Sequence, residues 1–425
     1  MATIPSTDQS RRIRTLDIVR GVAVMGILAM NIVGFAMPIQ AYFNPLAYGA
    51  ADALDQAVYA LNFVLVDGKM RGLFSFLFGA SMLLVIQRAE AAGESAASVT
   101  YRRLLWLLVF GAIHFYLIWF GDILMSYALA GMVAFLFRRL GVKALVRWGI
   151  ALLLLQFVIM AGSASYAHSL AAELAGPNPT AQTLKEWNDL AGDFAAPSAA
   201  KLQEILALHL GPWSGLARVQ LTDHLGEPFF FALLFGPETL AYMVFGMAAL
   251  KSGFLAGEWD HRQYRKVALV CLAIGIPIYA LIGWMLFSDG FTVPGIFTWY
   301  MAATVPFRPL MVLAYAALII LLTRQGGWLV DRIAAAGRAA FTNYLGTSIL
   351  MTFVFYGWGL GYYGAVGRAE LWLVVIAMWV LMLAWSKPWL DRFAYGPFEW
   401  LWRSLARWQL QPIRRPLSRA AAAEV

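Results

Sequence analysis

Long apolar segments separated by short polar loops recur along almost the whole chain. The runs 267–288 and 341–367 contain no charged residue, and a membrane-spanning helix needs about 20 mostly apolar residues. Counting such segments predicts ten spans, at approximately 18–38, 70–87, 104–120, 123–138, 145–163, 229–250, 267–288, 305–323, 340–360 and 369–386. Only Gly121 and Asp122 separate the third span from the fourth, which predicts a tight helical hairpin.

Composition agrees with this pattern. Hydrophobic residues make up 61% of the chain, charged residues 13%, and the mean hydropathy is +0.67. A soluble domain carries about 25% charged residues, so this chain lacks the polar surface that water requires. The sequence therefore predicts an all-α, polytopic integral membrane bundle of about ten transmembrane helices.

Basic residues set the orientation of the bundle. With the N-terminus inside, 25 of the 32 Lys and Arg residues fall in inner loops and tails, as the positive-inside rule requires. Both termini are therefore predicted to be cytoplasmic, and the net charge of +8 mainly expresses this bias. A nucleic-acid partner would need its basic residues on one soluble face, so none is expected.

Four regions are predicted along the chain. Residues 1–17 form a cytoplasmic N-terminal segment, 18–387 the transmembrane bundle, and 388–425 a basic, Trp-rich cytoplasmic tail. The outer loop 164–228 interrupts the bundle, and its stretch 200–210 has the period of an amphipathic helix on the membrane surface. Two interpretations of this insert are left open: it is a loop that packs against the bundle, or it is a lid that covers a site. The run GWGLGYYGAVG permits close helix contacts and is compatible with a homodimer.

Polar residues at the inner end of the first span have two interpretations. Asp17 and Arg20 are three residues apart, so they share a helix face and can form a structural ion pair. Alternatively, Arg11, Arg14 and Arg20 form a phosphate-binding entrance, because guanidinium groups match phosphate oxygens. Asn31 lies deeper on the same helix.

The ninth span carries a second polar row. Arg338 precedes it, and Thr342, Asn343 and Tyr344 follow one turn further in. One Ser or Thr would be ordinary contact between helices. Several polar side chains in succession indicate a lined channel.

Toward the outer end, His114 lies in an otherwise apolar segment and Asp122 begins the fourth span. Ionisable groups within a membrane commonly mark function, and imidazole exchanges protons near neutral pH. His114 is therefore the leading candidate for a general base, although a neutral histidine bonded to a backbone carbonyl is the alternative. For Asp122 the alternative is a helix N-cap.

Other charged residues are predicted at the outer face, where they line a site or act as snorkelling anchors: Asp67, Lys69, Arg71, Glu238 and Arg308. The five histidines have no metal-ligand spacing, and Cys271 is the only cysteine, so no metal is expected.

Six ordered blocks resemble the YeiB-like family of bacterial polytopic membrane proteins, which carry a domain of unknown function. The blocks are RTLDIVRGVAVMGILAMNI, GKMRGLFSFLFGAS, FGAIHFYLIWFGDILMSYALAG, FGMAALKSGF, GRAAFTNYLGTSIL and YGPFEWLWRSL, and they run from Arg14 to Arg403. The first block is also similar to the opening helix of heparan-glucosaminide N-acetyltransferase and of acyltransferase-3 proteins. Those acyltransferases usually place a histidine further along this helix, where this chain has Asn31.

The resemblance implies an acyltransferase of the bacterial inner membrane. An acyl-CoA co-substrate would dock at the inner face, with Arg20 and Arg338 as candidates for its phosphates. A small-molecule hydroxyl or amine would arrive from the extracytoplasmic side. His114 would be the base and Asp122 would orient its ring, while Asn343 or Tyr344 would donate to the oxyanion or line the channel.

Two other classes stay open. Intramembrane His and Asp can relay protons in a small-molecule or lipid transporter, and Pro237 and Pro277 could interrupt spans as broken helices do around transport sites. A non-catalytic scaffold or sensor is the third class. A continuous route from the inner arginines to His114 favours the enzyme, whereas broken helices around a closed pocket favour transport.

Overall fold

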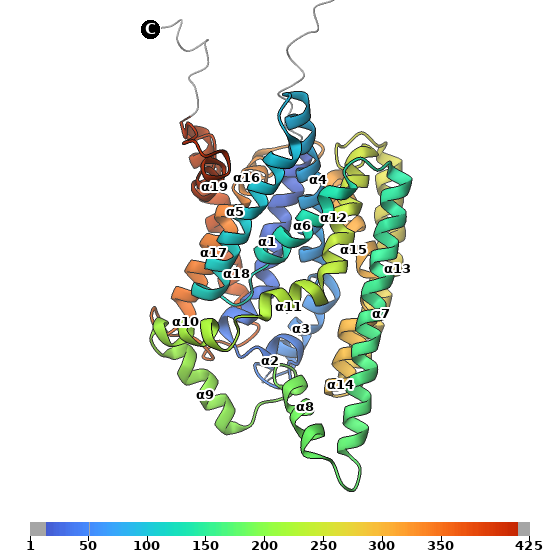
Figure 1. Ribbon diagram of the computed structural model, residues 1–425, viewed down its shortest axis with the longest axis vertical. Helices are drawn as coiled ribbons and strands as arrows, with labels where there is room; N and C mark the ends of the chain where they lie inside the picture. The colour runs from blue at the N-terminus through green and yellow to red at the C-terminus, as the bar shows by residue number, and fades with distance from the viewer. Residues whose placement is uncertain (1–13, 51, 415–425) are drawn as a thin grey trace, which may run out of the picture.

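The structure is a computed structural model that describes residues 14–50 and 52–414. These residues form α-helices and connecting loops (Figure 1), with an isolated β-bridge between Phe393 and Arg414. The all-α fold class predicted from the sequence is therefore confirmed. Residues 1–13 of the predicted N-terminal segment and 415–425 of the predicted tail lie outside the described residues.

Six stretches of helix in the described part are long and apolar enough to cross a membrane. They are α1 (Arg14–Ala36), α3 with α4 (Ala53–Leu65 and Lys69–Ala91), α5 (Ala96–Leu117), α7 (Val142–Leu174), α13 (His261–Ser288) and α18 (Leu371–Arg392). A bent pair adds another candidate, and it consists of α11 (Glu227–Leu234) and α12 (Gly236–Lys251). The chain is an integral membrane protein.

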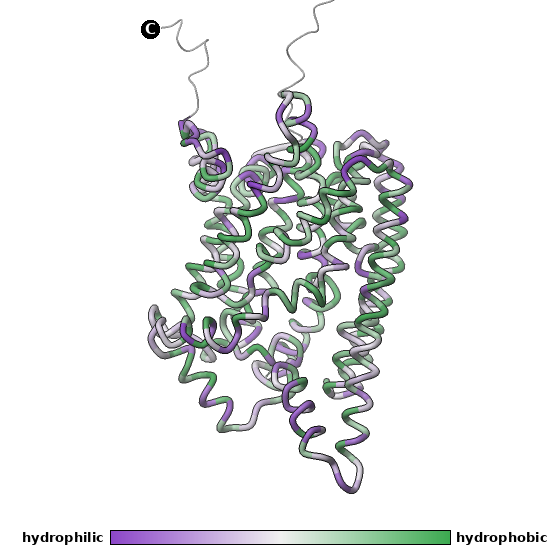
Figure 2. Tube along the Cα trace, viewed as in Figure 1, coloured by the Kyte–Doolittle hydropathy of each residue, from purple (hydrophilic) through white to green (hydrophobic). Residues whose placement is uncertain are grey.

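Three shorter apolar helices complete the agreement with the predicted spans. They are α6 (Leu124–Ala134), continued by η1 (Phe135–Phe137), then α15 (Arg308–Thr323) and α17 (Ala340–Phe355). Each of the ten predicted spans overlaps one of these helices or helix pairs, and the count of ten crossings stays a prediction. Figure 2 shows hydrophobic colour along most of α7 and α13 and hydrophilic segments gathered near the ends of the bundle.

Helix α1 lies in the middle of the bundle, against α4, α16 (Trp328–Arg338), α17 and α18 (Figure 1). The crossing of α1 and α16 requires glycine, because a Cβ on Gly337 would lie 1.8 Å from the carbonyl oxygen of Asp17. Small residues allow two backbones to approach in this way. This close contact places Arg20 of α1 beside the end of α16.

Short helices cover the two ends of the bundle. The tail helix α19 (Pro397–Arg407) contacts α5 and α17 at one end of the bundle (Figure 1). At the opposite end the outer insert contains α8 (Ala181–Ala191), α9 (Ala199–Leu210) and α10 (Trp213–Thr222). The other short helices are α2 (Gln40–Phe43), α14 (Val293–Gly295) and the π-helical segment η2 (Ile296–Ala302).

The outer insert docks onto the bundle through specific contacts. Ile205 and Leu206 of α9 pack on the core around α1 and α18, and the His209 ring stacks on Tyr363 with centroids 4.1 Å apart. The Trp213 indole donates to the Leu117 carbonyl at 2.7 Å. The amphipathic helix predicted at 200–210 therefore turns its apolar stripe toward the protein.

The glycine-rich run near the outer end of α17 is used within the chain. A Cβ on Gly357 would lie 1.8 Å from the Leu210 carbonyl oxygen, and the Gly364 amide donates to the Ala36 carbonyl at 2.7 Å. These contacts within one chain explain two of the glycines, so neither requires a contact with a second copy of the protein. A homodimer stays a proposal.

Docking of α9 is expected to weaken in acid. Burial lowers the pKa of His209 from 6.5 to about 4, so the imidazole takes up a proton more readily when α9 leaves the bundle. Docking is then fully stable above pH 6.5 and weakens as the pH falls toward 4. Hydrogen exchange of residues 199–210, corrected for the intrinsic effect of pH, should accelerate between pH 7 and pH 5.

The control for this prediction is His209→Gln, which cannot titrate and should flatten the pH dependence. The control is needed because Glu227 accepts a hydrogen bond from His224 and raises the pKa of that imidazole, which acts in the opposite direction. Equal acceleration in parent and variant would contradict the assignment to His209.

Candidate functional site

A cavity of about 230 Å³, called the inner cavity below, lies at the end of the bundle that is predicted to face the cytoplasm. Its walls come from α1, α4, α5, α6, α16, α17 and α19. One part of the wall is basic and comprises Arg20, Arg88, Arg103, Arg338 and Arg403. Only two of the lining residues are acidic, Asp17 and Glu399, so the inner cavity carries a surplus of positive charge.

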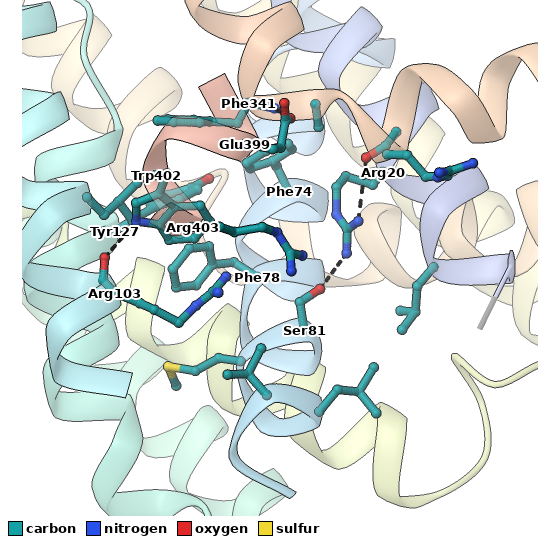
Figure 3. A pocket seen from close by; sticks show the side chains of 18 of the residues that line it. Arg20, Phe74, Phe78, Ser81, Arg103, Tyr127, Phe341, Glu399, Trp402 and Arg403 are labelled. Carbon is teal, nitrogen blue, oxygen red and sulfur yellow. Dashed lines mark hydrogen bonds between the residues drawn. The ribbon is translucent and has the colours of Figure 1, made fainter. Parts of the chain in front are cut away.

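Arg20 is held at this cavity by three groups. Its Nη1 lies 3.1 Å from an Asp17 carboxylate oxygen, which is the predicted ion pair, and 3.5 Å from the Gly337 carbonyl oxygen. Its Nη2 donates to the Ser81 hydroxyl at 2.6 Å. Figure 3 shows the guanidinium groups of Arg20, Arg103 and Arg403 turned toward the same space. The predicted ion pair and the predicted basic entrance therefore coexist.

Helix α19 supplies part of the basic wall and fixes its neighbours. The Trp402 indole donates to the Arg103 carbonyl at 2.9 Å, and its ring lies 4.3 Å from the Arg103 guanidinium carbon. This cation–π contact (Figure 3) orients Arg103 without neutralising it. Arg103 therefore keeps its charge available to the cavity.

Glu399 joins α19 to the start of α17. One carboxylate oxygen accepts the backbone amides of Phe341 at 2.7 Å and Thr342 at 3.1 Å, and the other accepts the Thr342 hydroxyl. Burial raises the pKa of Glu399 above its ordinary value. The carboxylate oxygens of Glu399 cap the start of α17. Glu399 thereby holds α19 against α17 along one side of the cavity.

The remaining wall is mostly apolar and aromatic. Phe74, Phe78, Leu104, Leu107 and Leu124 line it. Tyr127 and Tyr344 line it as well, and the buried Thr100 contributes a hydroxyl that has no hydrogen-bond partner among the described residues. The inner cavity thus joins a cationic surface to an apolar one, and the Thr100 hydroxyl remains able to donate and accept a hydrogen bond there.

His114 and Asp122 form the expected pair. Nδ1 of His114 lies 2.8 Å from one Asp122 carboxylate oxygen, and both side chains are buried. The other Asp122 oxygen accepts the Met125 amide at 2.8 Å. Asp122 therefore caps α6 and orients the imidazole at the same time, which unites the two interpretations of this residue.

The free edge of the imidazole has no partner within the described part of the chain. Nε2 of His114 is buried and makes no hydrogen bond there. The ring is absent from the lining of the inner cavity, but Tyr344, which does line it, lies 5.2 Å from the His114 ring between centroids. Tyr344 therefore stands between the cavity and the His114–Asp122 pair.

Arg11 of the predicted phosphate-binding entrance lies outside the described residues. The other predicted inner residues separate into two groups. Arg338, like Arg20 and Tyr344, lines the inner cavity, whereas Arg14 lies apart and pairs with Asp331. Asn31 borders a small void of about 10 Å³ together with Tyr344.

Two members of the predicted polar row at 342–344 are used structurally. The Asn343 amide donates to the Ala336 carbonyl at 3.0 Å and to Ser386 at 3.2 Å, and it accepts from the Trp385 indole at 2.9 Å. Thr342 bonds to Glu399. The structure thus brings only Tyr344 of this row to the cavity.

Sequence reasoning missed Arg88, Arg103 and Arg403 as cavity residues because they read as ordinary inner-loop positive charges. A signal was available in the tail, where Glu399 and Arg403 are four residues apart and share a face of α19 with Trp402. An acid, a tryptophan and an arginine on one helix face indicate that this face packs against protein or a ligand and is not simply exposed to water.

The predicted outer-face charges converge at a second place. Glu238 at the start of α12 lies 2.8 Å from Arg71 of α4 and also accepts from Arg308 of α15. The Lys69 side chain is buried. Its Nζ donates to the Phe63 carbonyl and lies 3.3 Å from the centre of the Tyr279 ring. Asp67, also buried, completes the outer charge cluster.

The fold and the two polar sites define a polytopic helical membrane protein with an arginine-lined inner cavity and a buried outer charge cluster. The family described as "Protein of unknown function (DUF418)" matches residues 249–409. The chain is 32% identical to "Uncharacterized protein YxaH" of Bacillus subtilis (strain 168), over 98% of this chain and 99% of that protein.

It is also 32% identical to "Uncharacterized protein YeiB" of Escherichia coli (strain K12), over 92% of this chain and 95% of the relative. The chain belongs to the YeiB-like family. No solved structure matches it.

Proposed function

We propose that this protein is an acyltransferase of the bacterial inner membrane, which uses a cytoplasmic acyl-CoA to acylate a hydroxyl or amine supplied from the extracytoplasmic side. The inner cavity supports this proposal, because five arginines meet an apolar wall there. Guanidinium groups bind phosphate oxygens through paired hydrogen bonds. An acyl-CoA carries phosphates at one end and a thioester at the other, so it matches both surfaces.

The size of the cavity limits what would enter. Pockets that enclose a small ligand occupy roughly 300–1,000 Å³, whereas this cavity measures about 230 Å³. Only the thioester end would therefore fit inside, and the phosphates would stay among Arg88, Arg103 and Arg403 at the basic wall. Arg20 and Arg338 would bind them from the other side.

In the proposed reaction, Nε2 of His114 takes the proton of the acceptor while the acceptor oxygen or nitrogen attacks the thioester carbonyl carbon. The carbon–sulfur bond then breaks, and the proton passes from the imidazolium to the departing thiolate, leaving free CoA and an ester or amide. Asp122 accepts from Nδ1 and stabilises the imidazolium. The Tyr344 hydroxyl is the candidate donor to the carbonyl oxygen.

Tyr344 must move for this reaction. The hydrogen bonds of its hydroxyl to the described residues are long, 3.3 Å from the Ile123 amide and 3.4 Å to the Gly121 carbonyl oxygen. Rotation of this ring would join the inner cavity to the imidazole. Membrane lipids surround the bundle, and the acceptor approaches through the outer half.

The proposal predicts acyl-CoA binding that depends on the cavity arginines. In purified protein, Arg403→Gln should raise the Kd for acetyl-CoA roughly tenfold, since a hydrogen bond to a charged group contributes about 1.5–3 kcal/mol. Isothermal titration would measure it. Arg407→Gln is the matched control, because Arg407 lies on the same helix, is exposed and does not line the cavity.

Equal affinity in the two variants, or no binding of acetyl-CoA by the parent protein, would contradict the proposal. Activity is tested separately, with labelled acetyl-CoA on one side of proteoliposomes and a panel of sugars and lipids on the other. Label transferred to an acceptor on the far side is the expected result.

A transporter is the second candidate, and the 59° bend between α11 and α12, next to Glu238 of the outer charge cluster, favours it. Discontinuous helices whose N-terminal ends face a substrate are common in secondary transporters. In that case the inner cavity would be one end of a transport route. Uptake of a labelled anion into proteoliposomes, without acyl transfer, would favour this candidate over the enzyme.

A further inference from the structure

One hydroxyl on the wall of the inner cavity has no partner within the described part of the chain. The Thr100 side chain is 2% exposed and lines the cavity, and its oxygen makes no hydrogen bond to the described residues. Threonines inside other helices, Thr323, Thr347 and Thr352, each donate to the carbonyl four residues earlier. Thr100 lies inside α5 but leaves this usual partner unused. A buried hydroxyl without a partner is unfavourable, and a ligand in the cavity would remove that cost.

Thr100 lies at the polar end of the face that α5 turns to the cavity. Arg103 follows one turn later and Leu104 lies beside it, further into the bundle, so this face changes from polar to apolar. The neighbouring wall from α4 has the same order, because Arg88 lies in its last turn and Phe78 lies deeper. Residues 92–95 join the two helices at this end. The Thr100 hydroxyl therefore belongs to the same end of the cavity as the arginines.

Arginines from two helices converge on this end. The centre of the Trp402 ring lies 4.3 Å from the Arg103 guanidinium carbon, and such a contact orients the group without cancelling its charge. Arg403, the next residue along α19, turns its guanidinium toward the same space (Figure 3). Glu399 is the acid that α19 contributes to the wall, and its oxygens cap α17. This end of the cavity therefore offers hydrogen-bond donors and positive charge to an anion.

We propose that Thr100, Arg103 and Arg403 bind a phosphate monoester, and that the Thr100 hydroxyl donates to one of its oxygens. A phosphate monoester has a charge of about −1.5 to −2 at pH 7 and three terminal oxygens, so it can accept from three side chains at once. A phosphate diester has fewer of both. The identity of the ligand rests on the proposed function, because coenzyme A carries a phosphate monoester on its ribose. Thr100 thereby selects acyl donors that keep the ribose phosphate.

The test compares acetyl-CoA with dephospho-acetyl-CoA, which lacks only the ribose phosphate. Isothermal titration of the purified protein in detergent gives the Kd for each ligand. Valine has nearly the shape of threonine but no hydroxyl, so Thr100→Val should raise the Kd for acetyl-CoA roughly tenfold, as expected for one hydrogen bond to a charged group. The Kd for dephospho-acetyl-CoA should not change. Thr100→Ser keeps the hydroxyl and should bind both ligands like the parent.

Thermal unfolding separates a role in binding from a role in folding. Because valine removes a buried hydroxyl that has no partner among the described residues, Thr100→Val without ligand should unfold at the parental Tm or slightly above it. Thr323→Val is the matched control, since Thr323 does not line the cavity and its hydroxyl donates to the Ile319 carbonyl. This control should bind acetyl-CoA with the parental Kd.

Parental affinity for acetyl-CoA in Thr100→Val would overturn the proposal, and an equal loss for the two ligands would overturn the assignment to the ribose phosphate. Acyl transfer is measured separately. A selective loss of acetyl-CoA binding, in a protein that transfers no acyl group, would retain the phosphate site and remove the proposed function. Transfer by the parent, combined with unchanged binding in Thr100→Val, would retain the function and remove the site.

Discussion

Replacing Glu238 by glutamine is expected to destabilise the protein by about 3–5 kcal/mol, the usual cost of removing one partner from a buried ion pair. Glu238 is the shared partner of Arg71 and Arg308, and its side chain is 1% exposed. Without it, the guanidinium groups of Arg71 and Arg308 remain close together at the starts of α4 and α15. The folded variant should be scarce in membranes, and its Tm in detergent should fall by several degrees.

The matched control for this prediction is Glu204→Gln. Glu204 pairs with Lys201 on the surface of α9, where the two side chains are 69% and 57% exposed. Exposed pairs contribute about 0–1 kcal/mol, so this variant should unfold like the parent. If Glu238→Gln were equally harmless, the cluster would have to be hydrated and its charges individually solvated.

The two ends of the bundle could be predicted because their chemistry is local. Each span needs an uninterrupted apolar run, and each inner loop needs basic residues, so both patterns are written along single segments. The same reasoning placed Arg20 and Arg338 at one end of the bundle, and both line the same cavity. Charge and depth, which a sequence shows directly, were sufficient for that step.

The remainder depended on contacts between segments far apart in the chain. Arg71 and Glu238 are 167 residues apart, and Arg308 follows Glu238 after 70 more; nothing in the sequence gives the rotation of their helices. Asn343 was predicted to line a channel, yet Ser386 and Trp385 of α18 take up its amide. A polar residue in an apolar segment needs a partner, and the sequence cannot tell a ligand from a neighbouring helix.

The interruption of the span predicted at 229–250 was in part readable. The structure bends this span by 59° between α11 and α12, next to Pro237, where an interruption was predicted. Gln156 of α7 holds that bend from a distant part of the chain. Pro237, which was predicted to interrupt this span, lies in the first turn of α12, where proline is tolerated because the first amides of a helix need no partner within it. Pro277 lies inside α13, which continues through it.

Replacing His114 by asparagine is expected to reduce acyl transfer by roughly 10²–10⁴-fold, the usual contribution of a general base. The asparagine amide can still donate to Asp122, so α5 and α6 should stay joined, but the second ring nitrogen is lost. The Kd for acetyl-CoA should be unchanged, because the basic wall is separated from His114 by Tyr344. Initial rates in proteoliposomes and isothermal titration measure the two effects.

The companion variant is Asp122→Asn. Its amide oxygen can still accept the Met125 amide and cap α6, yet it no longer offers a carboxylate to the imidazole, so transfer should fall while the helix start is retained. Loss of transfer together with loss of acetyl-CoA binding in His114→Asn would indicate a packing role for the ring. Transfer at the parental rate in that variant would remove His114 from the mechanism, and the unpartnered Nε2 would then be only a buried nitrogen without a function in acyl transfer.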